Sequence, residues 1–343
     1  MNDIRMISGN REDIPREYLI DLFSLMREYH DEVWYFKSLP MEYYKKNWTI
    51  GSSSNEAINW TIALNSTGKV IGYGFSVRNT NYDNLDKAYF MLFVTKNERR
   101  KGIGTELLKE IIHNLPEIIT TITTEIFESS IDGIAFIQSF NKDKGYQEIV
   151  SCSDFSEFNP EEVRKEAQKL KEKALNEGYE LIYIEDLNFI FHVNMNDFVK
   201  MEEAIWNDMP LEELSYDKEV VTVQRYDEMV QRRILQGNKL YTFIAIHKES
   251  GLPIGVTQTR LNLIDPKVAH QMDTGVMHSH RGKGIGLALK YQMLDKLLHE
   301  TKAQYWETGN AGSNEYMLKI NRILKHIPIA KVNIYEFKMN ELK

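Results

Sequence analysis

Apolar and polar residues follow two different periods along the chain, and these periods predict strands and helices in turn. The runs 60–77 and 241–260 are rich in β-branched and aromatic residues, and a polar turn that ends in Gly68 or Gly251 interrupts each of them. A run of this kind is typical of two antiparallel strands joined as a hairpin. Further strands are expected at 89–95, 120–126, 270–277 and 303–307.

A helix is expected between the strands at 89–95 and 120–126. Its apolar residues recur at intervals of three and four, so they share one helical face that can cover a sheet. These residues are Ile103, Leu107, Leu108, Ile111, Ile112 and Leu115. Strand, helix and strand in this order predict the crossover of α/β domains. We therefore expect an α/β fold, in which a mixed sheet carries flanking helices.

The same pattern occurs twice along the chain. An Ile-Gly pair opens the second strand of each hairpin, which matches Gly72 with Gly255, and a basic loop in each half matches Gly102 with Gly284. The two matched pairs have nearly the same separation along the chain. A long-period repeat of this kind indicates a duplicated domain.

A polar helix separates the two copies. Asn159-Pro160 has the residues of a helix cap and first turn, and Glu177-Gly178 has those of a helix end. We expect a first domain over 1–158, a connecting helix over 159–178 and a second domain over 179–343. The run of charges between is interpreted as a solvated helix face rather than a binding surface.

Both copies place a basic, glycine-bearing loop between a strand and a helix. It reads Arg99-Arg100-Lys101-Gly102-Ile103-Gly104 in the first copy and Arg281-Gly282-Lys283-Gly284-Ile285-Gly286 in the second. Glycines allow close approach of the backbone, and the first N–H groups of a helix lack partners and lie at its positive end. Arginine and lysine add charge and donors. The loops therefore predict a diphosphate-binding site, although a turn without a ligand is the alternative.

Two other phosphate-binding motifs are excluded. A Walker loop needs Gly-Lys followed by Ser or Thr, which neither loop has, and Leu107 and Leu289 stand where the dinucleotide fingerprint needs its third glycine. A general nucleotide-binding module is therefore a weaker interpretation.

Residues 94–104 and 276–286 resemble the signature motif of the GNAT-type N-acetyltransferase superfamily, in which a strand ending in valine leads into R-x-x-G-x-G. The second copy also carries Glu307-Thr308, Asn310-Ala311 and Asn314, and is similar to tandem members such as the mycothiol-synthase-like group. The resemblance implies two tandem GNAT domains and acetyl-CoA as co-substrate. It also implies direct attack of an amine on the thioester within a ternary complex.

The resemblance assigns cofactor-binding residues in both copies. In the second copy they are Val276, Met277, Arg281, Gly282, Lys283, Gly284, Ile285, Gly286, Asn310 and Asn314. In the first copy they are Val94, Arg99, Arg100, Lys101, Gly102, Ile103 and Gly104. A backbone N–H near Val94 or Val276, or in the residue after it, would polarise the thioester oxygen.

The tyrosine that often donates a proton to the leaving thiolate in this superfamily is missing from both copies. Its place is matched by Asn141 in the first copy and Asn321 in the second. An amide cannot act as a general acid at neutral pH, so Asn321 is expected at most to orient the sulfur. This departure keeps open a different class of function, a noncatalytic acyl-CoA-binding or sensing protein.

The second copy is favoured for catalysis. Asn314 fits a cofactor-contacting asparagine of the superfamily, whereas Ile134 is matched with it in the first copy and cannot make the same hydrogen bond. Asp273 and Glu307 lie on the two strands expected to diverge around the thioester, and burial would raise a carboxyl pKa toward that of a general base. Alternatively, both carboxylates only stabilise the structure or face solvent.

Composition limits the partners and the compartment. The net charge of −8 opposes nonspecific nucleic-acid binding. The single cysteine, Cys152, forms no internal disulfide, and no apolar stretch is long enough to cross a bilayer. We expect a cytoplasmic protein that acts on a small-molecule or peptide amine, without nucleic-acid or membrane partners. No metal is expected, because His270, His278 and His280 lack further ligands at suitable spacing.

Overall fold

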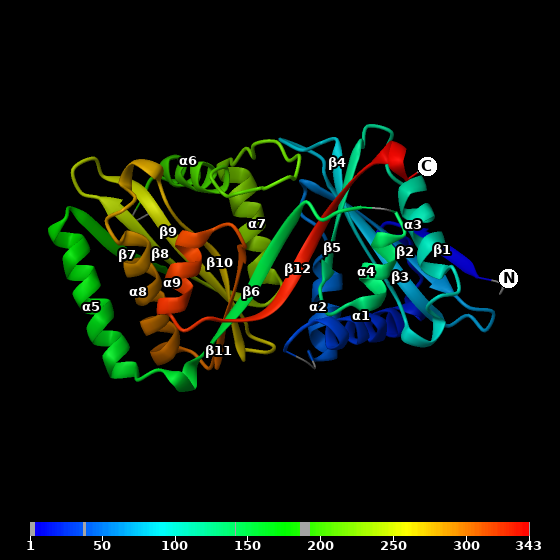
Figure 1. The fold of residues 1–343 in the computed structure, drawn as a ribbon, viewed down its shortest axis with the longest axis horizontal. Helices are drawn as coiled ribbons and strands as arrows, with labels where there is room; N and C mark the ends of the chain where they lie inside the picture. The colour runs from blue at the N-terminus through cyan, green and yellow to red at the C-terminus, as the bar shows by residue number, and fades with distance from the viewer. Residues whose placement is uncertain (1–3, 37–38, 141, 186–192, 343) are drawn as a thin grey trace. The chain divides into compact units, whose positions relative to one another are not determined.

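The computed structural model describes residues 4–36, 39–140, 142–185 and 193–342, and the chain divides into two compact units. Unit 1 comprises Met1–Glu148, Leu211–Asp217 and Ala330–Lys343. Unit 2 comprises Ile149–Pro210 and Lys218–Ile329. Both have the mixed α/β architecture predicted from the sequence (Figure 1).

The strands of unit 1 lie in the order β1-β2-β3-β4-β5-β12. Their bounds are β1 (Arg5–Gly9), β2 (Glu56–Leu64), β3 (Val70–Asn79), β4 (Lys87–Val94), β5 (Thr121–Phe127) and β12 (Ile327–Lys338). The predicted hairpin is β2–β3. Its turn is held by the Asn65 side chain, which accepts hydrogen bonds from the N–H groups of Thr67 and Lys69, and Gly68 supplies a φ of +80°.

Strands β4 and β5 are parallel but pair over only three positions. The register runs from Lys87 opposite Thr121 to Tyr89 opposite Thr123, and beyond this point the strands diverge. The other pairs in unit 1 are antiparallel, including β5 with β12. The divergence opens the carboxyl ends of β4 and β5.

Helices cover both faces of the unit 1 sheet. On one face lie α1 (Leu19–Val33) and α2 (Met41–Ile50), which pack on Tyr73, Met91 and Phe93 among others. On the other face lie α3 (Ile103–His113) and α4 (Ile131–Gln138), which pack on Ala88, Phe90 and Ile122. Alternate residues of β4 therefore face the α1 side and the α3 side, as the period of a strand requires.

The strands of unit 2 lie in the order β6-β11-β10-β9-β8-β7. Their bounds are β6 (Tyr146–Asp154), β7 (Tyr179–Glu185), β8 (Asn238–His247), β9 (Leu252–Asn262), β10 (Val268–Val276) and β11 (Tyr305–Ala311). The parallel pair β10–β11 again has three register positions, ending with His270 opposite Glu307. Unit 2 thus repeats the diverging pair of unit 1.

Two apolar cores hold the helices of unit 2. The helices are α5 (Pro160–Asn176), α6 (Met195–Trp206), α7 (Val223–Leu235), α8 (Ile285–Glu300) and α9 (Glu315–Ile323). One core contains Leu289, Met293 and Trp306 on the α8 side, and the other contains Phe198 and Tyr226 on the α6–α7 side. Short 3-10 helices are found at Arg11–Asp13, Arg16–Tyr18, Lys96–Glu98, Phe155–Glu157, His278–His280 and Met339–Glu341.

The last strand of each repeat belongs to the other unit. Strand β6 follows the first copy in sequence, but its residues from Ile149 onward belong to unit 2. Strand β12 follows the second copy, yet it pairs with β5 from Val332 opposite Phe127 to Lys338 opposite Thr121. The sequence division at residues 158 and 179 remains a prediction about the duplication, while the compact units are discontinuous.

The helix expected at 159–178 forms α5. Asn159 caps it by accepting hydrogen bonds from the N–H groups of Glu161 and Glu162, and Gly178 follows its end with a φ of +89°. This helix lies within unit 2 and packs against α8.

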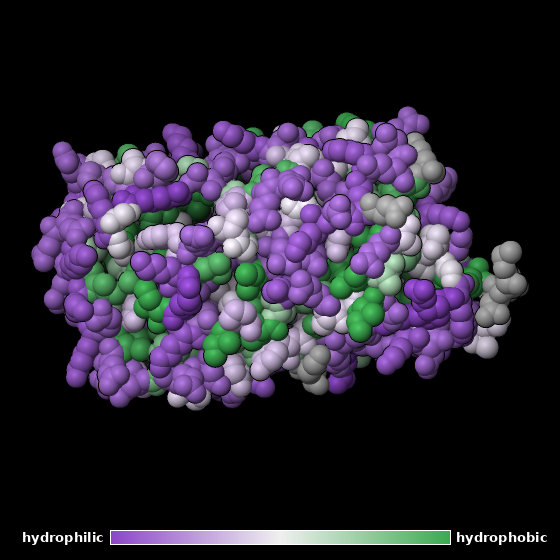
Figure 2. Space-filling view, viewed as in Figure 1, coloured by the Kyte–Doolittle hydropathy of each residue, from purple (hydrophilic) through white to green (hydrophobic). Residues whose placement is uncertain are grey.

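The face of the molecule drawn in Figure 2 is mainly hydrophilic, with apolar residues in scattered patches. Scattered apolar residues are normal on protein surfaces. Within the described ranges, no helix combines the length and the apolar character needed to cross a membrane.

Candidate active site

The loop between β4 and α3 leaves its backbone open at the start of a helix. It turns through two residues in the left-handed region, Arg100 with a φ of +63° and Gly102 with a φ of +84°. A Cβ placed on Gly102 would meet no atom within 4 Å, so the backbone is open there. The first N–H groups of α3 have no partner within the helix, and they lie at its positive end. The N–H groups of a backbone with this geometry can donate hydrogen bonds to a phosphate-like group.

Arg99 fastens this loop to its surroundings. Its Nε donates a 2.9 Å hydrogen bond to the carbonyl oxygen of Val94, at the end of β4. Its terminal nitrogens form ion pairs with Glu32 of α1 at 2.6 Å and with Asp132 of α4 at 3.0 Å. The bond to Glu32 is the largest cause that raises the Arg99 pKa. The sequence predicted Arg99 as a ligand of the cofactor, and the structure places its guanidinium on protein groups.

The loop of unit 2 repeats this construction. Arg281 Nε donates a 2.9 Å hydrogen bond to the carbonyl oxygen of Val276, and its guanidinium pairs with Asp208. Gly282 and Gly284 have φ values of +80° and +78°. Lys283 Nζ donates a 2.6 Å hydrogen bond to the hydroxyl of Tyr179. Both predicted loops therefore have the same backbone shape.

Other predicted loop residues contribute their backbone or lie in ion pairs. Ile103 and Ile285 are buried in the cores, so only their main chains face the loops. Lys101 pairs with Glu98 at 2.9 Å. Gly104 and Gly286 lie in the first turns of α3 and α8.

The N–H groups of the residues after the two valines are already bonded. Thr95 N–H donates to the carbonyl oxygen of Ile71 at 3.0 Å, and Met277 N–H donates to that of Ile254 at 2.8 Å. Both bonds point away from the divergence, toward β3 and β9. Because successive N–H groups of a strand point to opposite edges, those of Val94 and Val276 point toward β5 and β11. The valines are therefore the better oxyanion donors of the two predicted positions.

A cavity of about 360 Å³ lies in unit 1 where β4 and β5 diverge. It reaches from the loop and the start of α3 to α4 on one side and to the end of α1 on the other. Its lining includes five of the predicted cofactor-binding residues, which are Val94, Arg99, Arg100, Gly102 and Gly104. The structure therefore brings these residues together around one cavity.

Glu125 of β5 lies on the α1 side of this cavity. It follows Thr123 by two positions, so it shares a strand face with it. Its side chain is accessible through the cavity, yet protein atoms surround it, and this burial raises its pKa. Tyr29 of α1 also lines the cavity, and burial followed by the charge of Glu125 raises its pKa. The sequence analysis missed both residues. The signal for Glu125 was a charge inside the otherwise uncharged strand 121–127.

The cavity contains two charged side chains without an ion-pair partner. Glu32 and Asp132 are each paired with Arg99, and Glu98 is paired with Lys101. Arg100 and Glu125, which complete the charged lining, have no such partner among the described residues. One end of the cavity therefore offers a cation beside the loop, and the other offers a carboxylate beside α1.

The predicted general bases of unit 2 have different partners. Glu307 is 9% exposed, and its Oε1 lies 3.1 Å from Nδ1 of His270. Burial raises the pKa of Asp273, and the charge of Arg233 opposes that rise. Glu202 of α6 is fully buried near Asp273, and neither of its carboxylate oxygens is hydrogen-bonded to any residue that the structure describes. Its pKa is raised well above normal, chiefly by burial. The two predicted bases, Asp273 and Glu307, thus lie among other side chains of unit 2.

Three predicted asparagines of unit 2 bond within the protein. Asn321 donates a 2.6 Å hydrogen bond to Asn310 and accepts one of 3.1 Å from Lys290. Asn314 caps α9 by accepting the N–H of Met317 at 3.2 Å. Lys290 is fully buried, and burial lowers its pKa to about 7.

The helix caps correct the sequence match between Asn314 and Ile134. Helix α4 starts after Ser130 as α9 starts after Asn314, so Ser130 is the counterpart of Asn314. Counting onward from the caps, Ile137 is the counterpart of Asn321. The sequence match was made without the caps, which fix where each helix begins. Asn141 lies outside the described residues.

Within the described ranges, no group of three or more His, Cys, Asp or Glu side chains is arranged to hold a metal ion. His280 instead lies 3.0 Å from the Tyr179 hydroxyl through Nδ1, and burial is the main cause that lowers its pKa.

Comparisons with known proteins agree with the repeated fold. Residues 19–141 match the model of the acetyltransferase (GNAT) family. A tandem GNAT protein from the clavulanic acid biosynthesis pathway superposes with a TM-score of 0.75 at 18% identity, covering 98% of this chain and 99% of the other. A GCN5-related N-acetyltransferase from Sphaerobacter thermophilus gives a TM-score of 0.65 at 14% identity, covering 98% and 96%.

A third similar structure is a glucosamine N-acetyltransferase region of a fungal multi-domain β-N-acetylglucosaminidase. It has a TM-score of 0.68 at 13% identity, with coverage of 98% of this chain and 38% of the other. No curated protein matches the chain significantly. Identities this low show a shared fold. Residues 19–141 therefore form a domain of the GNAT acetyltransferase family, and the chain as a whole has the tandem GNAT fold.

Proposed function

We propose that the protein transfers the acetyl group of acetyl-CoA to an amine, and that the reaction takes place in the cavity of unit 1. The observation that carries this proposal is the arrangement of that cavity. It joins the anion-binding loop, the free edge of β4 at Val94 and the carboxylate of Glu125 in one space of about 360 Å³. A site of this kind can hold a diphosphate at one end and an amine at the other.

The loop residues would hold the diphosphate of acetyl-CoA. Gly102 lets the backbone approach the ligand, and the N–H groups of Ile103 and Gly104 start a helix and can donate to phosphate oxygens. Arg100 lines the cavity and has no ion-pair partner among the described residues, so it is available for phosphate. The N–H of Val94 would donate to the thioester oxygen as negative charge develops on it.

Glu125 would act as the general base. It takes a proton from the ammonium form of the acceptor, and the neutral nitrogen then forms a C–N bond with the acetyl carbon. The C–S bond breaks with its electron pair going to sulfur. The second proton leaves the nitrogen and reaches the sulfur through water, so that coenzyme A departs as a thiol. Burial raises the Glu125 pKa, which brings it closer to that of a base working near neutrality.

This proposal departs from the sequence-based preference for the C-terminal copy. That preference depended on matching Asn314 with Ile134, and the helix caps match Asn314 with Ser130 instead. In unit 2, Asn321 is bonded to both Asn310 and Lys290, so the two asparagines already have partners. These contacts support a structural role for the asparagines of unit 2.

Release of free thiol from acetyl-CoA with a panel of amines tests the proposal. We expect turnover by the wild-type protein and a loss of about 100-fold in kcat for Glu125→Gln, the size usual for a lost general base. Arg100→Glu should lower turnover at least about tenfold, and Lys283→Glu in the other loop should have a smaller effect. If Lys283→Glu abolishes turnover and Arg100→Glu does not, the second copy is the catalytic one.

The alternative is a noncatalytic acyl-CoA-binding or sensing protein. One observation favours it: Ile137 and Asn321 stand where the superfamily often has a proton-donating tyrosine, and neither side chain can donate a proton to a thiolate. Calorimetry with coenzyme A separates the two functions. Tight binding without thiol release for any amine would support the alternative. Action in the cytoplasm, on a small-molecule or peptide amine, is part of the main proposal.

A further inference from the structure

The α1 side of the unit 1 cavity has an apolar wall with one carboxylate that is not paired with Arg99. We call Tyr29, Met91, Phe93, Glu125 and Phe127 the acceptor wall, since all five line the cavity and lie on this face. The rings are packed edge to face, with 5.6 Å between the centroids of Tyr29 and Phe93. Phe127 similarly meets Trp34, the residue that follows α1, with 4.9 Å between centroids. The wall therefore presents rigid aromatic surface and a single negative charge.

A residue from a distant part of the sequence adjoins this wall. Residues 211–217 lie between α6 and α7 in sequence, but they belong to unit 1. The hydroxyl of Tyr216 lies 2.7 Å from Oγ1 of Thr123. Thr123 stands opposite Tyr89 in the last register position before β4 and β5 diverge, and it precedes Glu125 on the same strand face. Tyr216 therefore lies beside the last paired position of β4 and β5, two residues before Glu125, and just outside the lining of the cavity itself.

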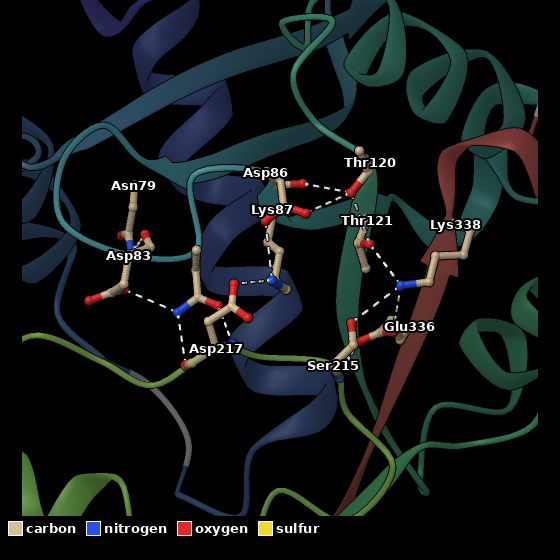
Figure 3. A network of polar contacts seen from close by, with 11 residues as sticks. Asn79, Asp83, Asp86, Lys87, Thr120, Thr121, Ser215, Asp217, Glu336 and Lys338 are labelled. Atoms are coloured by element: carbon tan, nitrogen blue, oxygen red, sulfur yellow. Dashed lines mark hydrogen bonds and ion pairs between the residues drawn. The ribbon is translucent and has the colours of Figure 1, made fainter.

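Several polar contacts hold this segment in place (Figure 3). The Asp217 carboxylate forms an ion pair of 2.9 Å with Lys87, whose side chain is only 8% exposed. The Asp217 N–H donates to Asn84 at 2.8 Å, and the Ser215 N–H donates to Glu336 at 2.8 Å. Contacts on both sides of Tyr216 therefore fix its position, rather than the single hydroxyl bond alone.

Three phenols are close enough to Glu125 to be affected by its charge. Burial is the main cause that raises the pKa of Tyr29, Tyr89 and Tyr216, and the charge of Glu125 raises each of them further. Among the described residues, Glu125 has no cation paired with it. An ammonium group is the complement of this arrangement, because it pairs with a carboxylate and is attracted to aromatic faces.

We propose that the acceptor is a primary amine carried on an apolar, aryl or alkyl, body, and that Tyr216 is a specificity-determining residue that closes the acceptor wall. The ammonium group lies at Glu125, and the apolar body lies against Tyr29, Phe93 and the ring of Tyr216. This inference rests on the proposed function of the cavity. A sugar amine suits the wall less well, because its hydroxyl groups would lose hydrogen bonds to water beside apolar side chains.

Binding of amines to the full chain, saturated with coenzyme A, tests this proposal without requiring turnover. Calorimetry is carried out with 2-phenylethylamine and with glucosamine on the wild type, Tyr216→Ala and Tyr216→Phe. We expect 2-phenylethylamine to bind at least about tenfold more tightly than glucosamine, and Tyr216→Ala to lose about tenfold of that affinity. Tyr216→Phe keeps the ring and should stay within about threefold. Tyr316→Ala removes an exposed tyrosine of unit 2 and serves as the control.

The outcomes separate the two proposals. Equal or tighter binding of glucosamine, or a folded Tyr216→Ala protein with unchanged affinity for 2-phenylethylamine, would overturn the inference. Thermal melting of each variant shows whether it is folded, and Tyr216→Phe remains informative if the alanine variant is not. Absence of coenzyme A binding or of thiol release with every amine would instead count against the proposed function.

Discussion

The Nε of Arg99 and the carbonyl oxygen of Val94 are joined by a hydrogen bond of 2.9 Å, which closes the loop that connects β4 to α3. Arg281 and Val276 repeat this bond at the same length in unit 2. A motif arginine expected to contact phosphate thus acts on the protein instead. It sets the path of the loop, and under the proposed function that path presents the N–H groups to the diphosphate.

Replacing Arg99 should therefore change both stability and ligand binding. Arg99→Gln loses the bond to Val94 and the ion pairs with Glu32 and Asp132, and the Arg99 side chain is only 14% exposed. We expect a loss of about 1–3 kcal/mol in the free energy of unfolding, together with about tenfold weaker coenzyme A binding. Denaturation and calorimetry measure the two effects.

Lys109→Gln is the control for this variant, because its pair with Glu106 is exposed on both sides. It should change the free energy of unfolding by less than about 0.5 kcal/mol. An Arg99→Gln protein that matches the wild type in both measurements would show that the bond to Val94 does not set the loop.

Two glycines with nearly equal backbone angles allow strain to be separated from ligand contact. Gly102 has a φ of +84° and Gly68 a φ of +80°, and a Cβ at either position would meet no atom within 4 Å. Alanine should therefore cost about 1–2 kcal/mol of stability at each position through backbone strain alone. Only Gly102→Ala should also weaken coenzyme A binding in calorimetry. Equal affinity in both variants would place the diphosphate elsewhere.

Glu125 should make the protein less stable as the pH rises. Its carboxyl pKa is raised above 4.5 in the folded state by burial, so the unfolded chain releases this proton first. Stability is therefore lost as the pH rises from about 4.5 through the raised pKa. Glu125→Gln should melt at a higher temperature than the wild type at pH 7 and at a similar temperature at pH 4. Glu106→Gln, on the exposed face of α3, should show no such difference.

The buried Lys290 should have a pH dependence of the opposite sign. Burial lowers its pKa to about 7 from 10.5, so between these values the unfolded chain binds a proton that the folded chain does not. Stability of unit 2 should therefore rise with pH across this window. Unfolding followed by tryptophan fluorescence measures this stability, since the centroid of the Trp306 ring lies 5.2 Å from Nζ of Lys290.

A triple variant tests the same cluster. Lys290→Leu, Asn310→Ile and Asn321→Ile give unit 2 the apolar residues found at matched positions in unit 1, which are Leu108, Ile126 and Ile137. We expect a gain of about 1–4 kcal/mol at pH 7 and loss of the pH dependence above pH 7. Lys173→Leu, on the exposed surface of α5, should leave that dependence unchanged.

Local patterns predicted the parts of the fold that depend on local chemistry. The period of apolar residues predicted strands β2 to β5 and β8 to β11 and helix α3, but not β1, β6, β7 or β12. The glycines predicted the two loops with their left-handed residues. The cap residues correctly predicted where α5 begins, because the Asn159 side chain accepts hydrogen bonds from two N–H groups of its first turn.

Features that depend on contacts between distant residues could not be predicted from the pattern. The pairing of β12 with β5 is one of these, because β12 is an ordinary apolar strand in sequence. Glu125 is another: one carboxylate inside a strand becomes notable only when the strand beside it diverges and α1 brings Tyr29 to the same face. The position of Tyr216 depends on the ion pair of Lys87 with Asp217, 130 positions apart, and on the hydrogen bond of Tyr216 with Thr123, 93 positions apart.

The pairing of β5 with β12 also affects how the chain is made. During synthesis, β5 is finished roughly two hundred residues before its antiparallel neighbour exists. Until residue 338 has been added, the nascent chain presents a free strand edge that other chains can pair with. A fragment that stops near residue 158 would keep that edge permanently, so we expect it to aggregate unless a peptide spanning residues 327–338 is supplied.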